Sequence, residues 1–218
     1  MEAFSADQLI AYLIFFGTLP FLIIGVTSFV KFAVVLGLLR NALGIQQLPP
    51  NIVLYSMAIV LSFYVMLPVG MQAGKVIDAT QAAKKPLLSA TQEIVKPFLE
   101  FTTKHTPQKE IDFYQDSAKK LWGEKLANDL VGPNATNLSK LIVAVPAFMT
   151  SELTKAFEIG FLIYLPFLVL DLVIANVLLA LGMSTLSPTT VSLPIKLVLF
   201  IGLNGWTRLF EALVLSYS

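Results

Sequence analysis

Three long stretches of this chain carry no side chain that is charged at neutral pH. They cover residues 8–30, 41–74 and 172–195. Each is longer than the ~20 apolar residues that a helix needs to cross a bilayer. A soluble helical protein would instead place charged residues along the outer face of every helix. These stretches therefore predict a helical protein of the membrane class.

The composition supports this class and excludes several others. Charged residues make up 13% of the chain and hydrophobic residues 56%, whereas an average soluble domain is about 25% charged. The net charge of +1 gives no reason to expect a nucleic-acid partner. The chain has no cysteine, which excludes disulfides and thiolate metal sites, and we expect no cofactor.

The apolar residues group into four expected helices, at 8–39, 51–73, 157–182 and 190–215. Prolines inside them, such as Pro20, Pro68, Pro166 and Pro194, each remove a backbone hydrogen bond and kink a helix. Broken helices at membrane depth need neighbouring protein or a cavity. We therefore predict an all-α, membrane-associated fold of two kinked helical hairpins that pack against partners and flank a polar insert.

The polar insert is expected at 74–140, between a first hairpin at 1–73 and a second at 141–218. Pro107 is a favourable first residue for a helix. Apolar residues then recur at helical spacing until Gly132, which is followed by a proline. The sequence predicts one helix between Pro107 and Gly132, with a solvated face of alternating lysines and acids.

Charged side chains inside the apolar segments are costly, and they pair or face a polar group by default. Such residues are Lys31, Asp171, Lys196, Arg208 and Glu211, with Glu152, Lys155 and Glu158 before the third segment. Arg208 is close enough to Glu211 for a local pair on one helical face. Lys31 and Lys196 either pair or extend to an interface. Asp171 is too short for that, so it needs a donor from another helix or subunit.

The motifs of common enzymes are missing, so we expect no catalytic activity. A repeated Leu-Pro-Phe-Leu, at 19–22 and 165–168, indicates an internal duplication of the kind that transporters often show. A small secondary transporter is therefore one alternative function. A structural membrane scaffold protein is another.

Several long motifs resemble the FliP/SctR family, the core export-apparatus proteins of type III secretion systems. They cover residues 31–44, 46–47 and 49 near the start, and then 146–161, 166–175, 179–183, 193–200 and 205–206. No lysine or arginine precedes Lys31, so the basic start of a signal peptide is missing. We therefore expect the virulence-associated injectisome branch (SctR), since flagellar members (FliP) often carry a cleaved leader.

This resemblance implies a subunit of a gated pore through which unfolded protein substrates leave the cytoplasm. It implies a pentamer, built into a ring or cone with FliQ/SctS-like and FliR/SctT-like subunits, and a large export-gate protein and a switch protein docked beneath. It also implies a location in the bacterial inner membrane, with the insert and much of the assembly on the periplasmic side. Most basic residues lie between Lys75 and Lys155, against the positive-inside rule, but long loops are translocated largely regardless of charge.

The resemblance also implies roles for particular residues. Glu152 and Lys196 match two positions of the family whose side chains look like ionic partners between subunits. The loop 182–190 matches a methionine-rich gasket that closes the pore, although only Met183 of the methionine run is present here. We expect Met183 and Leu186 to form a looser seal, because methionine is adaptable enough to deform around a passing chain.

Overall fold

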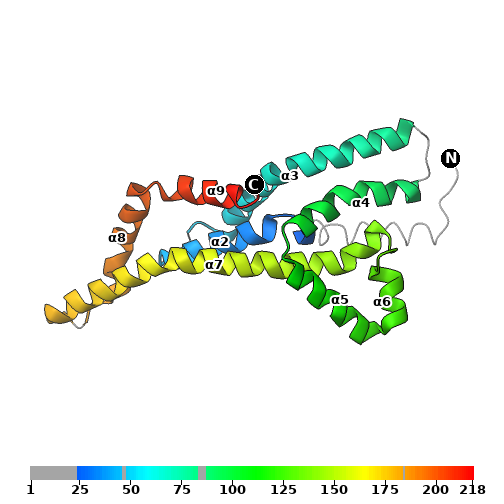
Figure 1. Cartoon of the computed structure of the whole chain (residues 1–218). Helices are drawn as coiled ribbons and strands as arrows, with labels where there is room; N and C mark the ends of the chain where they lie inside the picture. The colour runs from blue at the N-terminus through cyan, green and yellow to red at the C-terminus, as the bar shows by residue number, and fades with distance from the viewer. Residues whose placement is uncertain (1–23, 46–47, 83–86, 184) are drawn as a thin grey trace, which may run out of the picture. The chain divides into compact units, whose positions relative to one another are not determined.

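A computed structural model describes residues 24–45, 48–82, 87–183 and 185–218, and within these ranges the regular structure is helical (Figure 1). The predicted all-α fold is confirmed, while the ring or cone stays a prediction. Eight helices are assigned in the described ranges: α2 (Phe29–Ala42), α3 (Asn51–Ala82), α4 (Leu87–Lys104), α5 (Gln108–Trp122), α6 (Glu124–Val131), α7 (Asn137–Ala180), α8 (Pro188–Gly202) and α9 (Gly205–Leu215).

The chain divides into two compact units, and both long helices contribute to each of them. The insert unit contains Pro68–Ser151 and the described residues before Phe29, whereas the apolar unit contains Phe29–Leu67 and Glu152–Ser218. The expected division into an insert at 74–140 and two flanking hairpins stays a prediction.

In the insert unit, two helices replace the single one predicted between Pro107 and Gly132. α5 ends at Trp122 and α6 begins at Glu124, with Gly123 between them at φ +82°. That left-handed backbone strongly favours glycine, because a Cβ would be strained there. The break lets α6 pack beside α5 (Figure 1). A small core then forms from Ala118 of α5, Ala127 and Val131 of α6, and Val143 of α7.

Two helices of the described chain are long and apolar enough to cross a membrane, and a third span results if α8 and α9 count as one broken helix. The two are Asn51–Ala79 within α3 and the whole of α7. The first predicted segment, 8–39, is covered only from residue 24 onwards. Pro20, the repeat at 19–22 and residues 46–47 of the resemblance lie outside the described residues.

α7 is one helix from Asn137 to Ala180, whereas the sequence predicted a helix that begins only at residue 157. Pro146 and Pro166 both lie inside it. A proline removes only one backbone hydrogen bond, and the charged residues near Glu152 are paired, so they do not end the helix. α3 similarly contains Pro68 and extends beyond the predicted end at residue 73.

The last predicted helix, 190–215, is also wrong as a single element. The structure keeps Pro194 inside α8 and breaks the chain at Leu203 and Asn204, where α8 and α9 meet at 62°. Asn204 has φ 53°, a left-handed conformation that asparagine tolerates better than most residues. Gly205 follows because a Cβ there would clash with the ring of Phe200.

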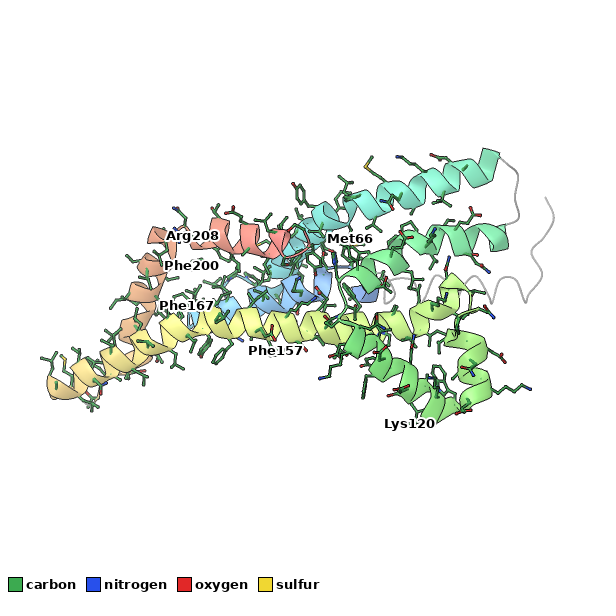
Figure 2. The ribbon with its side chains drawn as sticks, viewed as in Figure 1. Met66, Lys120, Phe157, Phe167, Phe200 and Arg208 are labelled. Carbon is green, nitrogen blue, oxygen red and sulfur yellow. The ribbon has the colours of Figure 1, made fainter. Side chains whose placement is uncertain are left out.

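Aromatic rings support this bend within the apolar unit. Phe200 of α8 lies 6.5 Å from Phe167 of α7 and 5.3 Å from Trp206 of α9, measured between ring centroids. Figure 2 shows Phe167 and Phe200 close together on neighbouring helices. Aromatic pairs at such separations contribute about 0.5–1.5 kcal/mol beyond their burial. The bend is therefore fixed by packing from three helices.

Candidate functional site

The first cluster of charges in the apolar unit, the Lys31 cluster, joins α2 to α7. Lys31 Nζ lies 3.2 Å from Glu152 Oε2, and both side chains are only 1% exposed. Lys155, one turn further along α7, donates from Nζ to Glu152 Oε1 at 3.2 Å. Buried charges are stable only when they are paired and hydrogen-bonded. Glu152 meets this requirement through two lysines.

Tyr217 completes the Lys31 cluster from beyond the end of α9. Its hydroxyl donates a hydrogen bond to Glu152 Oε2, and its ring centroid lies 3.5 Å from Lys31 Nζ. The same ring meets Phe32 edge to face, with centroids 5.8 Å apart. Burial and the Glu152 carboxylate both raise the pKa of the Tyr217 hydroxyl. The hydroxyl therefore keeps its proton and acts as a donor.

The second cluster, the Lys196 cluster, joins α8 to α7 and to the end of α2. Lys196 Nζ donates to Asp171 Oδ2 at 2.7 Å and to the backbone oxygen of Ala42 at 3.3 Å. The Asp171 side chain is 31% exposed, and its buried Oδ1 accepts no hydrogen bond from the described part of the chain. Unlike the Lys31 cluster, this pair retains an unfilled acceptor.

Gly44 lies beside the ammonium group of Lys196, at the end of α2. It follows α2 at φ +79°, and a Cβ built on it would lie 3.9 Å from Lys196 Nζ. Glycine adopts this left-handed conformation without strain, which turns the chain away after Ala42. The turn leaves the Ala42 carbonyl accessible to the lysine.

The two clusters connect α8, and the end of the chain after α9, to α7. Along α7 they are about 20 residues apart, or ~30 Å of helix at 1.5 Å per residue. The returning chain, from Lys196 to Tyr217, spans nearly the same number of residues. The returning chain thus makes one ion pair with α7, Lys196–Asp171, and one hydrogen bond, Tyr217–Glu152.

The structure gives Glu152 and Lys196 separate partners within the chain. Glu152 binds Lys31, Lys155 and Tyr217, whereas Lys196 binds Asp171 and Ala42. Their expected pairing between subunits stays a prediction. The sequence did not indicate Tyr217, because one tyrosine after an apolar helix has no distinctive pattern.

Arg208 differs from the expectation of a buried charge. Its side chain is exposed (Figure 2). The side chain of Glu211 is exposed as well. The physical reason is the break at Asn204, which starts α9 with Leu209 and Leu213 on its buried face. Arg208 lies outside the buried face that Leu209 and Leu213 form, so its side chain is exposed. Met183 and Leu186 lie in the loop between α7 and α8, and each is 46% exposed.

Among the described residues, no three histidine or acidic side chains gather closely enough to hold a metal ion. The buried charged groups of the apolar unit, Lys31, Glu152 and Lys196, all lie in ion pairs, and these pairs connect one helix to another. Long apolar helices joined through buried ion pairs define a helical, membrane-associated protein.

A family comparison identifies the class more closely. The family model for the FliP family matches residues 12–213, and the chain belongs to that family. It is 49% identical to the Yop proteins translocation protein R of Yersinia pestis over 203 residues, which cover 92% of this chain and 91% of that protein. The predicted family is thereby confirmed.

Two further relatives indicate the branch. The hypersensitivity response secretion protein HrcR of Ralstonia nicotianae is 46% identical over 225 residues, covering all of both chains. The virulence protein YscR of Salmonella typhimurium is 42% identical over 216 residues, or 98% of each. These names refer to secretion and virulence, which places the chain in the injectisome branch and fits a subunit of a protein-export apparatus. They are not the names of enzymes.

Proposed function

We propose that this chain is a type III secretion subunit that forms, with other subunits, the gated pore through which unfolded substrate proteins leave the cytoplasm. The observation that carries the proposal is the 49% identity to a translocation protein over nearly the whole chain. The proposal includes no catalytic step and no cofactor. The chain would contribute helices, ion-pair anchors and a pore loop.

Uncovered apolar side chains support assembly with other subunits. Only 11% of the most apolar stretch of α7 is buried within the chain, and Phe157, Phe161 and Leu162 all face outwards. Such surfaces on a helix need lipid or protein as a cover. We propose that neighbouring copies, in a pentamer, and the FliQ/SctS-like and FliR/SctT-like subunits supply much of this cover.

The length of α7 supports an assembly that extends beyond the bilayer. Its 44 residues correspond to ~66 Å of helix, whereas the hydrocarbon core is ~30 Å thick. One straight crossing would use about half of α7. We propose that the complex lies in the inner membrane, with the insert on the periplasmic side and the large export-gate and switch proteins below.

The loop between α7 and α8 is the proposed gasket. Gly182, at φ +73°, ends α7 and leads into Met183, so the chain reverses there with exposed apolar side chains at its tip. Several copies of Met183 and Leu186 around an axis would close a narrow opening without a rigid plug. The pore loop follows directly from α7, which the two ion clusters hold.

Purification of the full chain with its co-expressed partners in mild detergent tests this function. We expect a large, ring-like complex that contains two other small hydrophobic proteins, as measured by light scattering, mass spectrometry and imaging. A folded, monodisperse monomer or dimer that binds a small solute would instead support the transporter alternative and contradict the proposal.

A further inference from the structure

Tyr217, the residue before the last, lies against the fully buried Lys31–Glu152 pair. We infer that Tyr217 is a positioning residue that fixes the Glu152 carboxylate and the Lys31 ammonium with two different parts of one side chain. The Tyr217 side chain is thus a lock that holds the end of α9 against α2 and α7.

The lock depends on which groups donate hydrogen bonds to the two oxygens of the Glu152 carboxylate. Oε1 accepts a hydrogen bond from Lys155, and Oε2 faces both Lys31 and the Tyr217 hydroxyl. A buried carboxylate needs donors on both oxygens, and bonds to an ionised acceptor are stronger than neutral ones. The hydroxyl therefore adds a donor that is fixed in direction by a rigid ring.

The aromatic ring performs the second function. Lys31 Nζ lies 3.5 Å from the ring centroid, within the range of a cation–π interaction, which strengthens when water is excluded. Phe32 packs against the same ring in a T-shaped arrangement, with centroids 5.8 Å apart. The ring thus confines the ammonium group on the side that the carboxylate does not occupy.

The sequence of α9 delivers Tyr217 to this place. Leu209, Leu213 and Tyr217 are each four residues apart, and all three are buried, so they continue one stripe of α9. The bend at Asn204 aims that stripe back along α7. This role concerns the folded chain itself, so it goes beyond the proposed export function and does not depend on it.

Thiol labelling of the full chain in membrane vesicles tests the inference, because the natural chain has no cysteine. Ala156→Cys reports on α7 one turn from Glu152, where the side chain is 0% exposed. Ala42→Cys reports on the Lys196 cluster. Each reporter is combined with Tyr217→Phe, Tyr217→Leu or the control Tyr64→Phe, whose tyrosine is exposed.

We expect Tyr217→Phe to speed labelling at residue 156 about tenfold, which corresponds to one lost hydrogen bond to a charged group. Tyr217→Leu should speed it further, because the ring over Lys31 is also lost. Neither variant should change labelling at residue 42, and Tyr64→Phe should change neither rate. In a Glu152→Gln background, Tyr217→Phe should have a much smaller effect, because the ionised acceptor is gone.

Two outcomes would overturn the inference. Equal acceleration at residues 156 and 42 would show that Tyr217 supports the apolar unit in general. Unchanged labelling at residue 156 in both Tyr217 variants would show that its contacts hold nothing in place. Neither result bears on the complex found by purification, so the lock and the export function can fail separately.

Discussion

The Lys31 cluster and the Lys196 cluster both pair a lysine with a carboxylate between helices, but the two carboxylates differ in their exposure and in their hydrogen bonds. Glu152 is 1% exposed and receives hydrogen bonds or ion pairs from three side chains. Asp171 is 31% exposed and pairs with Lys196, and its Oδ1 accepts no hydrogen bond from the residues that the structure describes. The first cluster is saturated and closed, whereas the second has an acceptor left for a further donor.

This difference separates two uses of charge in an apolar protein. A closed cluster fixes helices of one chain to one another, because both oxygens of the buried Glu152 carboxylate already accept hydrogen bonds. An open cluster fixes a helix and also leaves an unpaired acceptor, which costs about 1–3 kcal/mol until it is met. We expect the Lys196 cluster to be the one that changes its contacts when neighbouring subunits assemble.

The largest expected effect is on the closed cluster. Glu152→Gln keeps the shape of the side chain but leaves Lys31 buried without its counter-charge, which should cost about 3–5 kcal/mol of unfolding free energy. The matched variant Asp171→Asn should cost clearly less, because Lys196 keeps the Ala42 carbonyl and lies near a partly exposed group.

Thermal unfolding of the purified chain in detergent measures both variants. The control Lys31→Met/Glu152→Met removes both charges and should recover most of the loss, since two apolar side chains replace a buried pair without an orphan charge. Equal destabilisation by Glu152→Gln and Asp171→Asn would break the comparison between the two clusters.

A reversal of charge at Lys196 distinguishes pairing within the chain from pairing between subunits. Lys196→Glu faces Asp171 and should destabilise the chain and block assembly. Asp171→Lys should restore the unfolding temperature, because it recreates the pair inside one chain. Glu152→Lys should restore part of the yield of the complex, if Glu152 of one subunit meets Lys196 of the next.

The two rescues are measured separately, by unfolding of the chain and by the amount of complex that copurifies. If Asp171→Lys restores the complex fully and Glu152→Lys does not restore it at all, the proposed pairing between subunits is wrong. Normal secretion by the Lys196→Glu variant alone would show that secretion needs neither the Lys196–Asp171 pair nor a Lys196–Glu152 pair between subunits.

The sequence predicted the features that depend on local pattern. Charge-free apolar stretches predicted helices of the membrane class, and the short side chain of Asp171 predicted a donor from another element. The partners themselves were not predictable, because Lys31 and Glu152 are far apart in the sequence and meet only through tertiary packing. Pattern alone also identified Arg208 as buried, whereas the break at Asn204 turned it outwards.

The misplaced helix boundaries have the same physical origin. Prolines do not mark these boundaries, since Pro166 and Pro194 lie inside α7 and α8, as they do in the predicted helices. The actual breaks occur at Gly123 and Asn204, where the backbone is left-handed. Whether a glycine or asparagine adopts that conformation depends on what its neighbours pack against, such as the ring of Phe200 beside Gly205.

A smaller effect is expected between the clusters, where α2 lies against α7. A Cβ on Gly160 would clash with the side chain of Leu38, so Gly160→Ala should cost about 1–3 kcal/mol of unfolding free energy through overpacking. Gly37→Ala is the matched control, because its Cβ would meet no atom within 4 Å. Gly160→Ala/Leu38→Ala should recover part of the loss. Equal unfolding temperatures for Gly160→Ala and Gly37→Ala would show that this contact does not link the clusters.

The smallest effect on stability is expected at the loop that neither cluster holds directly. Met183→Ser and Leu186→Ser change side chains that are nearly half exposed, so each should alter the unfolding free energy of the chain by less than about 0.5 kcal/mol. Each should nevertheless raise ion leakage through the assembled complex in vesicles, because a polar ring seals less well than an apolar one. Leu181→Ser, an exposed change just outside the loop, is the control and should leak like the natural chain. Unchanged leakage in the double variant Met183→Ser/Leu186→Ser, with assembly intact, would place the seal on another subunit.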